Sequence, residues 1–371
     1  MAGKRNTWKT AGIWLLRGFA ALLVAGSLMS TTDFNQWWIR IWDFPRVQIL
    51  LAMVASAVAL WVFDRAWRPW MPLALAIASA WQFYRVIPYT PLAPTKVDRV
   101  ADSEAEGEGC FTLLTLNVLQ KNRDYARTIA LIERVDPDIL LLTETDQAWA
   151  DALAPVLAAY PGRIDRPLSN TYGIMFASRL AMRDASIRDL AQKDTPSVFA
   201  TLSVGGHDFR MIGLHPRPPQ PKQDTEERDA EIVVAARMAR DLAMPVLAIG
   251  DFNDVAWSDT TRLFKDIGGF LDPRIGRGTY ASFPAGMVWL GWPLDHLFVT
   301  EEFLLAEMEV GKSVGSDHRP FIARICLDPE AARRRNDKAE APSAKDEAEA
   351  NEVMEEFEED EAKDAIEGEE G

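Results

Sequence analysis

Residues 246–253 read Val-Leu-Ala-Ile-Gly-Asp-Phe-Asn: four apolar residues, then a glycine, then a turn with two polar side chains. An apolar run this short, bounded by a turn residue, is typical of a buried β-strand rather than of a helix. Asp251 and Asn253 follow the strand directly, two residues apart. The stretch therefore predicts a strand that carries a polar pair to one edge of a sheet.

The same arrangement extends in both directions along the chain. Short apolar runs of strand length cover residues 111–118, 139–143, 173–177, 199–204, 209–214, 246–249, 295–299 and 321–327, and helical spacing covers residues 125–135, 148–159 and 226–242. Many short strands with few helices over about 220 residues predict an α/β domain of packed sheets covered by helices.

Polar residues stand where these predicted strands begin or end: Asn117, Glu144, His215, Asp251, Asn253, Asp295, Asp317 and His318. Hydrolysis of a phosphate ester needs an activated water, a charge clamp and a protonated leaving group. Mg²⁺ prefers oxygen ligands and keeps several waters, so Glu144, Asn117 and Asp317 are candidate ligands for Mg²⁺, with Mn²⁺ as the alternative.

The other members of this set are candidates for acid–base work. His318 paired with Asp295 is a candidate general base held in one tautomer. His215 can donate to phosphate oxygens, and Asp251 with Asn253 can orient the water and the scissile phosphate. Each residue alone also has a structural interpretation, as a turn, a solvated charge or a helix cap. His296 is expected on the face opposite Asp295, in a structural role.

The motifs TLNV, LLLTE, GLHPRPP, GDFN, PLDHLFV and GSDHRPF occur in this order between residues 110 and 328. In that order they resemble the endonuclease/exonuclease/phosphatase superfamily, which includes DNase-I-like nucleases, sphingomyelinases and inositol polyphosphate 5-phosphatases. The resemblance implies a four-layer sandwich, two mixed sheets face to face with helices outside. It implies metal-site roles for Asn117 and Glu144, and catalytic roles for the His215, Asp251/Asn253, Asp295 and Asp317/His318 motifs. It also suggests that Asn170 and Arg179 face the cleft. Thr143 departs from the pattern, since many members carry Gln before the metal-site Glu.

Three apolar runs precede this domain, at residues 11–30, 47–63 and 71–88, and nine of the 13 Trp lie within the first 81 positions. About 20 apolar residues span a membrane, so we expect about three transmembrane helices in residues 1–90. A signal peptide and buried soluble helices are the alternatives. Lys4, Arg5 and Lys9 place the N-terminus in the cytoplasm, and three spans then place the catalytic domain outside it, anchored to the inner or plasma membrane. If the third run only dips into the bilayer, this orientation reverses.

The charge of −15 is concentrated at the C-terminus, where residues 330–371 hold 17 Asp/Glu against 6 Lys/Arg. We expect residues 91–109 to form a linker, residues 110–328 the catalytic domain, and residues 329–371 an acidic disordered tail. Transient helix is expected at residues 348–361. The composition excludes a disordered chain, a basic nucleic-acid-coating protein and a disulfide-dense scaffold. Cys110 and Cys326 open the first and end the last strand of the domain, so antiparallel pairing would allow a disulfide.

The substrate class stays open at this level. The domain without its tail is close to neutral, whereas a basic face would favour nucleic acid. A membrane-anchored, metal-dependent nuclease or phosphodiesterase is the first hypothesis. A phospholipid or small-molecule phosphoesterase is the second, and a non-catalytic membrane scaffold is the third. Partners are accordingly a phosphodiester substrate and the lipid bilayer.

Overall fold

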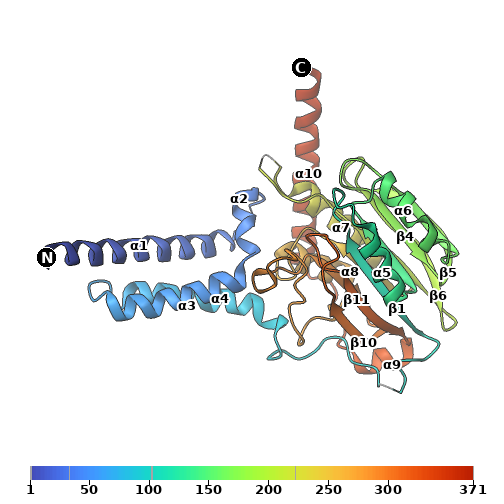
Figure 1. Ribbon diagram of the computed structural model, residues 1–371, viewed down its shortest axis with the longest axis horizontal. Helices are drawn as coiled ribbons and strands as arrows, with labels where there is room; N and C mark the ends of the chain where they lie inside the picture. Colours follow the sequence, from blue (N-terminus) through green and yellow to red (C-terminus); the bar gives the residue numbers. More distant parts are fainter. Residues whose placement is uncertain (1, 33, 102, 222, 371) are drawn as a thin grey trace. The chain divides into compact units, whose positions relative to one another are not determined.

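The computed structural model describes residues 2–32, 34–101, 103–221 and 223–370 (Figure 1). The chain divides into two compact units, Met1–Ala93 with Gln220–Asp224, and Pro94–Pro219 with Thr225–Gly371. We describe each unit by itself.

The first unit is helical. It contains α1 (Ala2–Met29), α2 (Trp37–Arg40), η1 (Ile41–Asp43), α3 (Arg46–Phe63), α4 (Trp70–Val86) and η2 (Ile87–Tyr89). Two of its segments, Trp8–Met29 and Arg46–Phe63, are long and apolar enough to cross a membrane. The third predicted span, residues 71–88, forms α4 with only 17 helical residues before η2. It therefore stays a prediction.

Polar side chains gather inside this unit while large apolar ones face outward. Arg46 is fully buried, and its Nη1 donates to Gln82 Oε1 at 3.0 Å and to Ser30 Oγ at 3.2 Å. Arg17, which interrupts the first apolar run, is paired through two hydrogen bonds of 2.6 and 2.8 Å with Asp64. Exposed apolar side chains line all three long helices, for example Leu15, Phe63 and Ile77. Arg46 also forms an ion pair with Asp43, so both of these arginines are paired with a carboxylate within the unit.

The second unit contains two mixed sheets. The six-stranded sheet has the order β10-β11-β1-β2-β4-β3, and the five-stranded sheet has the order β5-β6-β7-β8-β9. The strands are β1 (Cys110–Asn117), β2 (Ile139–Thr143), β3 (Gly162–Arg166), β4 (Ile174–Ser178), β5 (Ala181–Asp189), β6 (Pro196–Val204), β7 (His207–Leu214), β8 (Val246–Asp251), β9 (Asp295–Val299), β10 (Phe303–Val310) and β11 (Phe321–Leu327). Among the named strands of the described residues, β1 with β2 and β7 with β8 pair in parallel, and the other pairs are antiparallel.

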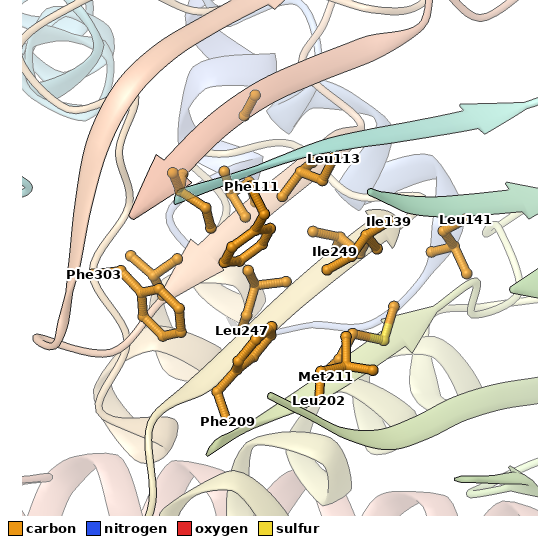
Figure 2. Packing of buried hydrophobic residues seen from close by; sticks show 14 of the residues in the cluster. Phe111, Leu113, Ile139, Leu141, Leu202, Phe209, Met211, Leu247, Ile249 and Phe303 are labelled. Carbon is orange, nitrogen blue, oxygen red and sulfur yellow. The ribbon is translucent and has the colours of Figure 1, made fainter. Parts of the chain in front are cut away.

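The sheets face each other across one apolar core, and helices cover their outer faces (Figure 1). Figure 2 shows Phe111, Leu113 and Ile139 of one sheet packing against Phe209, Leu247 and Ile249 of the other. Helices α5 (Tyr125–Val135) and α6 (Gln147–Leu157) cover the first sheet, and α7 (Glu226–Arg240) and α8 (Asp259–Gly268) cover the second. The predicted α/β sandwich of two mixed sheets flanked by helices is confirmed.

The disulfide left open by the sequence is present. Cys110 and Cys326 stand directly opposite each other in the antiparallel β1–β11 pair, and their sulfurs are bonded. The bond closes a loop of 216 residues, for which chain entropy predicts a stabilisation of about 5 kcal/mol. It fastens the first strand of the unit to its last.

The predicted linker and the predicted tail both contribute residues that pack against the second unit. Val97, in the predicted linker, is 1% exposed within the core between the sheets. The predicted disordered tail forms α9 (Pro329–Arg335) and α10 (Ala344–Glu370). Ala350 of α10 is fully buried against α7 and α8, and Arg262 of α8 pairs with Asp346 and Glu349. Helix α10 is therefore held by a narrow apolar stripe and by ion pairs with Arg262, although its acidic composition is typical of a disordered segment.

Candidate active site

The polar residues that follow the strands share the face that points between the sheets. Side chains alternate along a strand. Phe111 and Leu113 of β1 lie in the inter-sheet core, so Asn117 at the end of β1 emerges on the same side. Leu247 and Ile249 place Asp251 of β8 there in the same way. The alternation thus brings both sheets' polar ends to one edge of the sandwich.

The glycine of the GDFN turn is required by the close approach of two strands. Gly250 has φ +141°, and a Cβ on it would lie 2.0 Å from the backbone oxygen of Leu214 in β7. No other residue fits this position without moving the strand. Beyond it, Asn253 adopts φ +49°, and its N–H donates to Asp251 Oδ1 at 3.0 Å. Its Nδ2 donates to Pro216 O at 2.9 Å, which ties the turn to the segment after β7.

His318 lies between two carboxylates. Asp251 and Asp295 are directly paired residues of β8 and β9. His318 Nδ1 is 2.8 Å from Asp295 Oδ2, and its Nε2 is 3.5 Å from Asp251 Oδ2. Burial alone would lower the pKa of His318, but the two carboxylates outweigh it and raise that pKa to about 10. The three groups form a buried acid–base cluster that retains a proton at neutral pH.

His296 behaves as the strand alternation predicts. It faces away from Asp295, between Phe252 and Phe298 on the helix-covered side of the sheet. Its Nδ1 lies 2.7 Å from Arg274 Nη2, and its Nε2 lies 2.9 Å from Asp254 O. The residue therefore connects structural elements and does not join the group at the sheet edge.

Glu144 and Asn117 form the other half of the site. Asn117 Nδ2 donates to Glu144 Oε1 at 2.8 Å and to Asp251 Oδ2 at 3.0 Å, so it joins the two sheets. Glu144 has φ +59° and accepts a second bond at Oε2 from the Gln120 N–H at 3.0 Å. Ser316 Oγ donates to Asn117 O at 2.6 Å, which brings the neighbouring Asp317 to the same corner.

These oxygen donors suit a hard divalent cation. Within the described ranges, no group of three or more His, Cys, Asp or Glu side chains is arranged to hold a metal ion. Mg²⁺ does not need such a group, because it binds through one or two carboxylates and retains waters or substrate phosphate. The carboxylate of Glu144 beside the Asn117 amide fits that requirement, and Asp317 is the neighbour of Ser316, which bonds to Asn117.

His215 is placed against the same cluster from the second sheet. It is 2% exposed, and its Nε2 is 3.8 Å from Asp251 Oδ2. Its Nδ1 has no hydrogen-bond partner in the part of the chain that the structure describes. Burial lowers the pKa of His215 to about 4, so the imidazole is neutral at neutral pH. A buried ring nitrogen without a partner is available to a bound ligand.

The two residues suggested for substrate phosphate are placed differently. Arg179 follows the far end of β4, because Ile174 pairs with Thr143 next to Glu144 whereas Ser178 pairs with Ile139. Arg179 instead pairs with Asp136, so the structure does not bring it to the site. Asn170 lies in the loop before β4, where its Nδ2 donates to Asp194 O at 2.9 Å.

Contacts between loops bring in residues that the sequence did not single out. The centroid of the Tyr172 ring lies 5.7 Å from that of the His215 ring. The guanidinium carbon of Arg217 lies over the same Tyr172 ring, 5.2 Å from its centroid. Arg228 of α7 donates to Asn253 O at 3.3 Å and supports the GDFN turn from below. Arg217 belongs to the GLHPRPP motif, so the sequence offered a reason to consider it. Nothing in the sequence around Tyr172 indicated that this residue contacts His215 and Arg217.

Comparison with known proteins identifies the family of this chain. The model of the endonuclease/exonuclease/phosphatase family matches residues 114–318. The chain belongs to this family. Its members are hydrolases that act on phosphoester bonds. No match is found among curated protein sequences.

Solved structures of similar fold come from several organisms. The Danio rerio TDP2 complexed with single-strand DNA product is 14% identical, with a TM-score of 0.50, and the match covers 58% of this chain and 98% of that one. An endonuclease/exonuclease/phosphatase from Bacteroides vulgatus is 17% identical, with a TM-score of 0.49 and coverage of 59% and 99%. The human Nocturnin catalytic domain with bound sulfate is 16% identical, with a TM-score of 0.49 and coverage of 59% and 95%.

Proposed function

We propose that this protein is a membrane-anchored, divalent-metal-dependent phosphodiester hydrolase of the nuclease or phosphodiesterase type. The observation that carries the proposal is the buried Asp251–His318–Asp295 cluster, which Asn117 connects directly to Glu144. An acid–base group beside an oxygen-donor metal corner is what attack of water on phosphorus requires.

Each side chain has a role that its position suggests. Asp295 holds His318 in one tautomer through the 2.8 Å contact at Nδ1 and leaves Nε2 toward Asp251. His318 would act as the general base in its neutral form, which the charge of a bound divalent cation favours over the protonated form that prevails without the ion. The neutral imidazole takes the proton of the attacking water, while Asp251 and Asn253 orient the water and the phosphate. His215, neutral and with an unpaired Nδ1, contacts a phosphate oxygen and assists the leaving group.

Glu144, Asn117 and Asp317 would hold the metal, Mg²⁺ with Mn²⁺ as the alternative. Such an ion supplies charge neutralisation at the phosphoryl oxygens. Gln120 fixes Glu144 by donating its backbone N–H to Oε2 at 3.0 Å. Asn117 fixes it from the other side, so the carboxylate is oriented by two donors before any ion arrives.

Membrane anchoring is part of the proposal. The outward-facing apolar side chains of α1, α3 and α4, with the charges paired inside, suit a helical bundle in lipid. The Cys110–Cys326 disulfide favours an oxidising compartment for the second unit. Both observations support an extracytoplasmic catalytic unit attached to the inner or plasma membrane.

The second candidate function is a phospholipid or small-molecule phosphoesterase, favoured by the proximity of a lipid surface. The scaffold hypothesis is weaker, because no residue of the motif set is missing. The test uses the full chain in detergent with Mg²⁺ against single- and double-stranded DNA, RNA, sphingomyelin and bis(p-nitrophenyl) phosphate. We expect turnover of a phosphodiester that is lost in His318→Ala. Activity that survives His318→Ala in a folded protein would refute the assigned chemistry.

A further inference from the structure

Arg217 lies two residues after His215 in a segment that cannot fold back on itself. The sequence reads His215-Pro-Arg217-Pro-Pro, so both residues precede a proline, which restricts each of them to extended backbone. In extended chain, side chains two residues apart emerge on the same side, about 6–7 Å apart along the backbone. The segment therefore presents an imidazole and a guanidinium on one side at a fixed spacing.

Contacts around Tyr172 show where the guanidinium lies. The Tyr172 ring contacts both side chains, with its centroid 5.7 Å from that of the His215 ring and 5.2 Å from Arg217 Cζ. Because His215 Nε2 is 3.8 Å from Asp251, Arg217 is one aromatic ring removed from the reacting groups. It flanks the site and does not touch it.

Two hydrogen bonds fix the orientation of Arg217. Its Nε donates to Thr195 Oγ1 at 2.9 Å, and its Nη2 donates to Lys193 O at 3.0 Å. Its Nη1 forms an ion pair with Glu227 at 3.7 Å from Oε2, which is longer than a hydrogen bond. The side chain is 25% exposed. A pre-oriented guanidinium whose Nη1 is held only by this longer ion pair matches the oxygens of a phosphate, which would compete with Glu227 for it.

We propose that Arg217 binds a second phosphate of the substrate, next to the one that is hydrolysed. The inference rests on the proposed function and narrows its substrate class to phosphodiesters that carry a further phosphate. That group is either the next diester of a polynucleotide or a terminal monoester. Sphingomyelin has a single phosphate and a quaternary ammonium group, so it offers no second phosphate to Arg217.

The competing explanation is that Arg217 only holds the loop between β5 and β6. Arg166 offers a matched control, because its Nη1 and Nη2 donate to Asp189 and Asp194 of the same region at 2.7 Å each. Loss of Arg166 would loosen that loop without removing the cation beside Tyr172. A structural role of Arg217 predicts equal effects of the two variants on every substrate.

The experiment uses the full chain in detergent and compares wild type, Arg217→Gln, Arg217→Lys and Arg166→Gln. Two substrates carry one phosphate, bis(p-nitrophenyl) phosphate and the dinucleotide TpT. Two carry a second phosphate: in the trinucleotide TpTpT it is a further diester, and in pTpT it is a terminal monoester. We expect Arg217→Gln to lower kcat/KM on the two-phosphate substrates by about 10–100-fold, since a charge-assisted bond is lost. Its effect on the one-phosphate substrates should stay within about threefold, with Lys intermediate and Arg166→Gln leaving the ratio unchanged. The substrate on which Arg217→Gln causes the larger loss of kcat/KM, TpTpT or pTpT, shows whether the second phosphate is a diester or a terminal monoester.

A binding measurement separates this inference from the proposed function. Thymidine 3′,5′-bisphosphate and thymidine 5′-monophosphate are titrated into each variant without turnover. A preference for the bisphosphate that Arg217→Gln removes supports the inference, even if the wild type hydrolyses none of the substrates and the proposed function fails. Equal losses on all ligands, or a preference that survives Arg217→Gln, would overturn it.

Discussion

At the residue scale, the site depends on a histidine whose orientation one carboxylate sets. Asp295 accepts from His318 Nδ1 at 2.8 Å and is fully buried. Asp295→Asn keeps the shape but replaces the acceptor, so the ring can adopt the wrong tautomer. We expect kcat to fall by about 10²–10⁴-fold with little change in KM. Steady-state kinetics with a circular dichroism control checks this, and a loss below threefold would remove Asp295 from the proposed role.

A second residue-scale prediction concerns Glu231, which is buried in α7 away from the reacting groups. Burial raises the pKa of Glu231 to about 8, although Ser197 Oγ donates to it at 2.6 Å. Its unfolded pKa is near 4.5, so the folded state favours the protonated form. The associated stability is complete below pH 4.5 and falls by about 1.4 kcal/mol per pH unit up to pH 8.

Glu231→Gln should remove that dependence, because the amide stays neutral. Urea denaturation of both proteins at pH 5 and pH 9 measures the free energy of unfolding. The variant is expected to lose less stability between the two pH values than the wild type does. Identical pH dependence in both proteins would show that folding does not raise the pKa of Glu231.

Single residues were predictable where local pattern decides their position. Strand alternation predicted that Asp295 and His296 lie on opposite faces, and the short polar motifs at strand ends identified the group that the structure brings together. Arg179 and Tyr172 are residues whose positions could not be predicted from local sequence. Which end of β4 meets Glu144, and which ring meets His215, depends on pairings between segments far apart in sequence.

At the element scale, the fully buried strands and the helices α5, α6 and α7 were predicted, while helix α8 and the partly exposed edge strands β3, β5 and β10 were not. β3 and β5 carry Arg and Asp on half-exposed faces, so their sequences show no clear apolar alternation. They are strands because neighbours offer unpaired backbone groups. Helix was expected at residues 348–361, but the docking of α10 was not, because the apolar surface of α7 and α8 that buries Ala350 and Val353 lies far away in the sequence.

The packing of α10 gives an element-scale prediction. Ala350→Asp places a carboxylate in a fully buried position without a partner, which costs several kcal/mol unless the helix detaches. We expect α10 to become sensitive to limited proteolysis while phosphodiester hydrolysis is kept, because the catalytic groups lie on other elements. Glu352→Gln, at an exposed position of the same helix, is the control. Unchanged proteolysis of Ala350→Asp would argue against the docked helix.

At the scale of the whole molecule, the proposal places the catalytic unit outside the cytoplasm. Reporter fusions at the C-terminus test this in cells. An enzyme reporter that needs disulfides for activity should be active, and a fluorescent reporter that folds only in the cytoplasm should give no fluorescence. The opposite pattern would mean that an even number of spans precedes the catalytic unit, with α4 not crossing the membrane.

The central claim is metal-dependent hydrolysis at the corner formed by Glu144 and Asn117. The most direct measurement is hydrolysis of bis(p-nitrophenyl) phosphate by the full chain during titration with Mg²⁺ after chelation, for wild type and Glu144→Gln. The account predicts no turnover with chelator, recovery with added Mg²⁺, and at least a tenfold higher half-saturating Mg²⁺ concentration in Glu144→Gln. Turnover that persists in chelator, or a Glu144→Gln titration that matches the wild type, would contradict it.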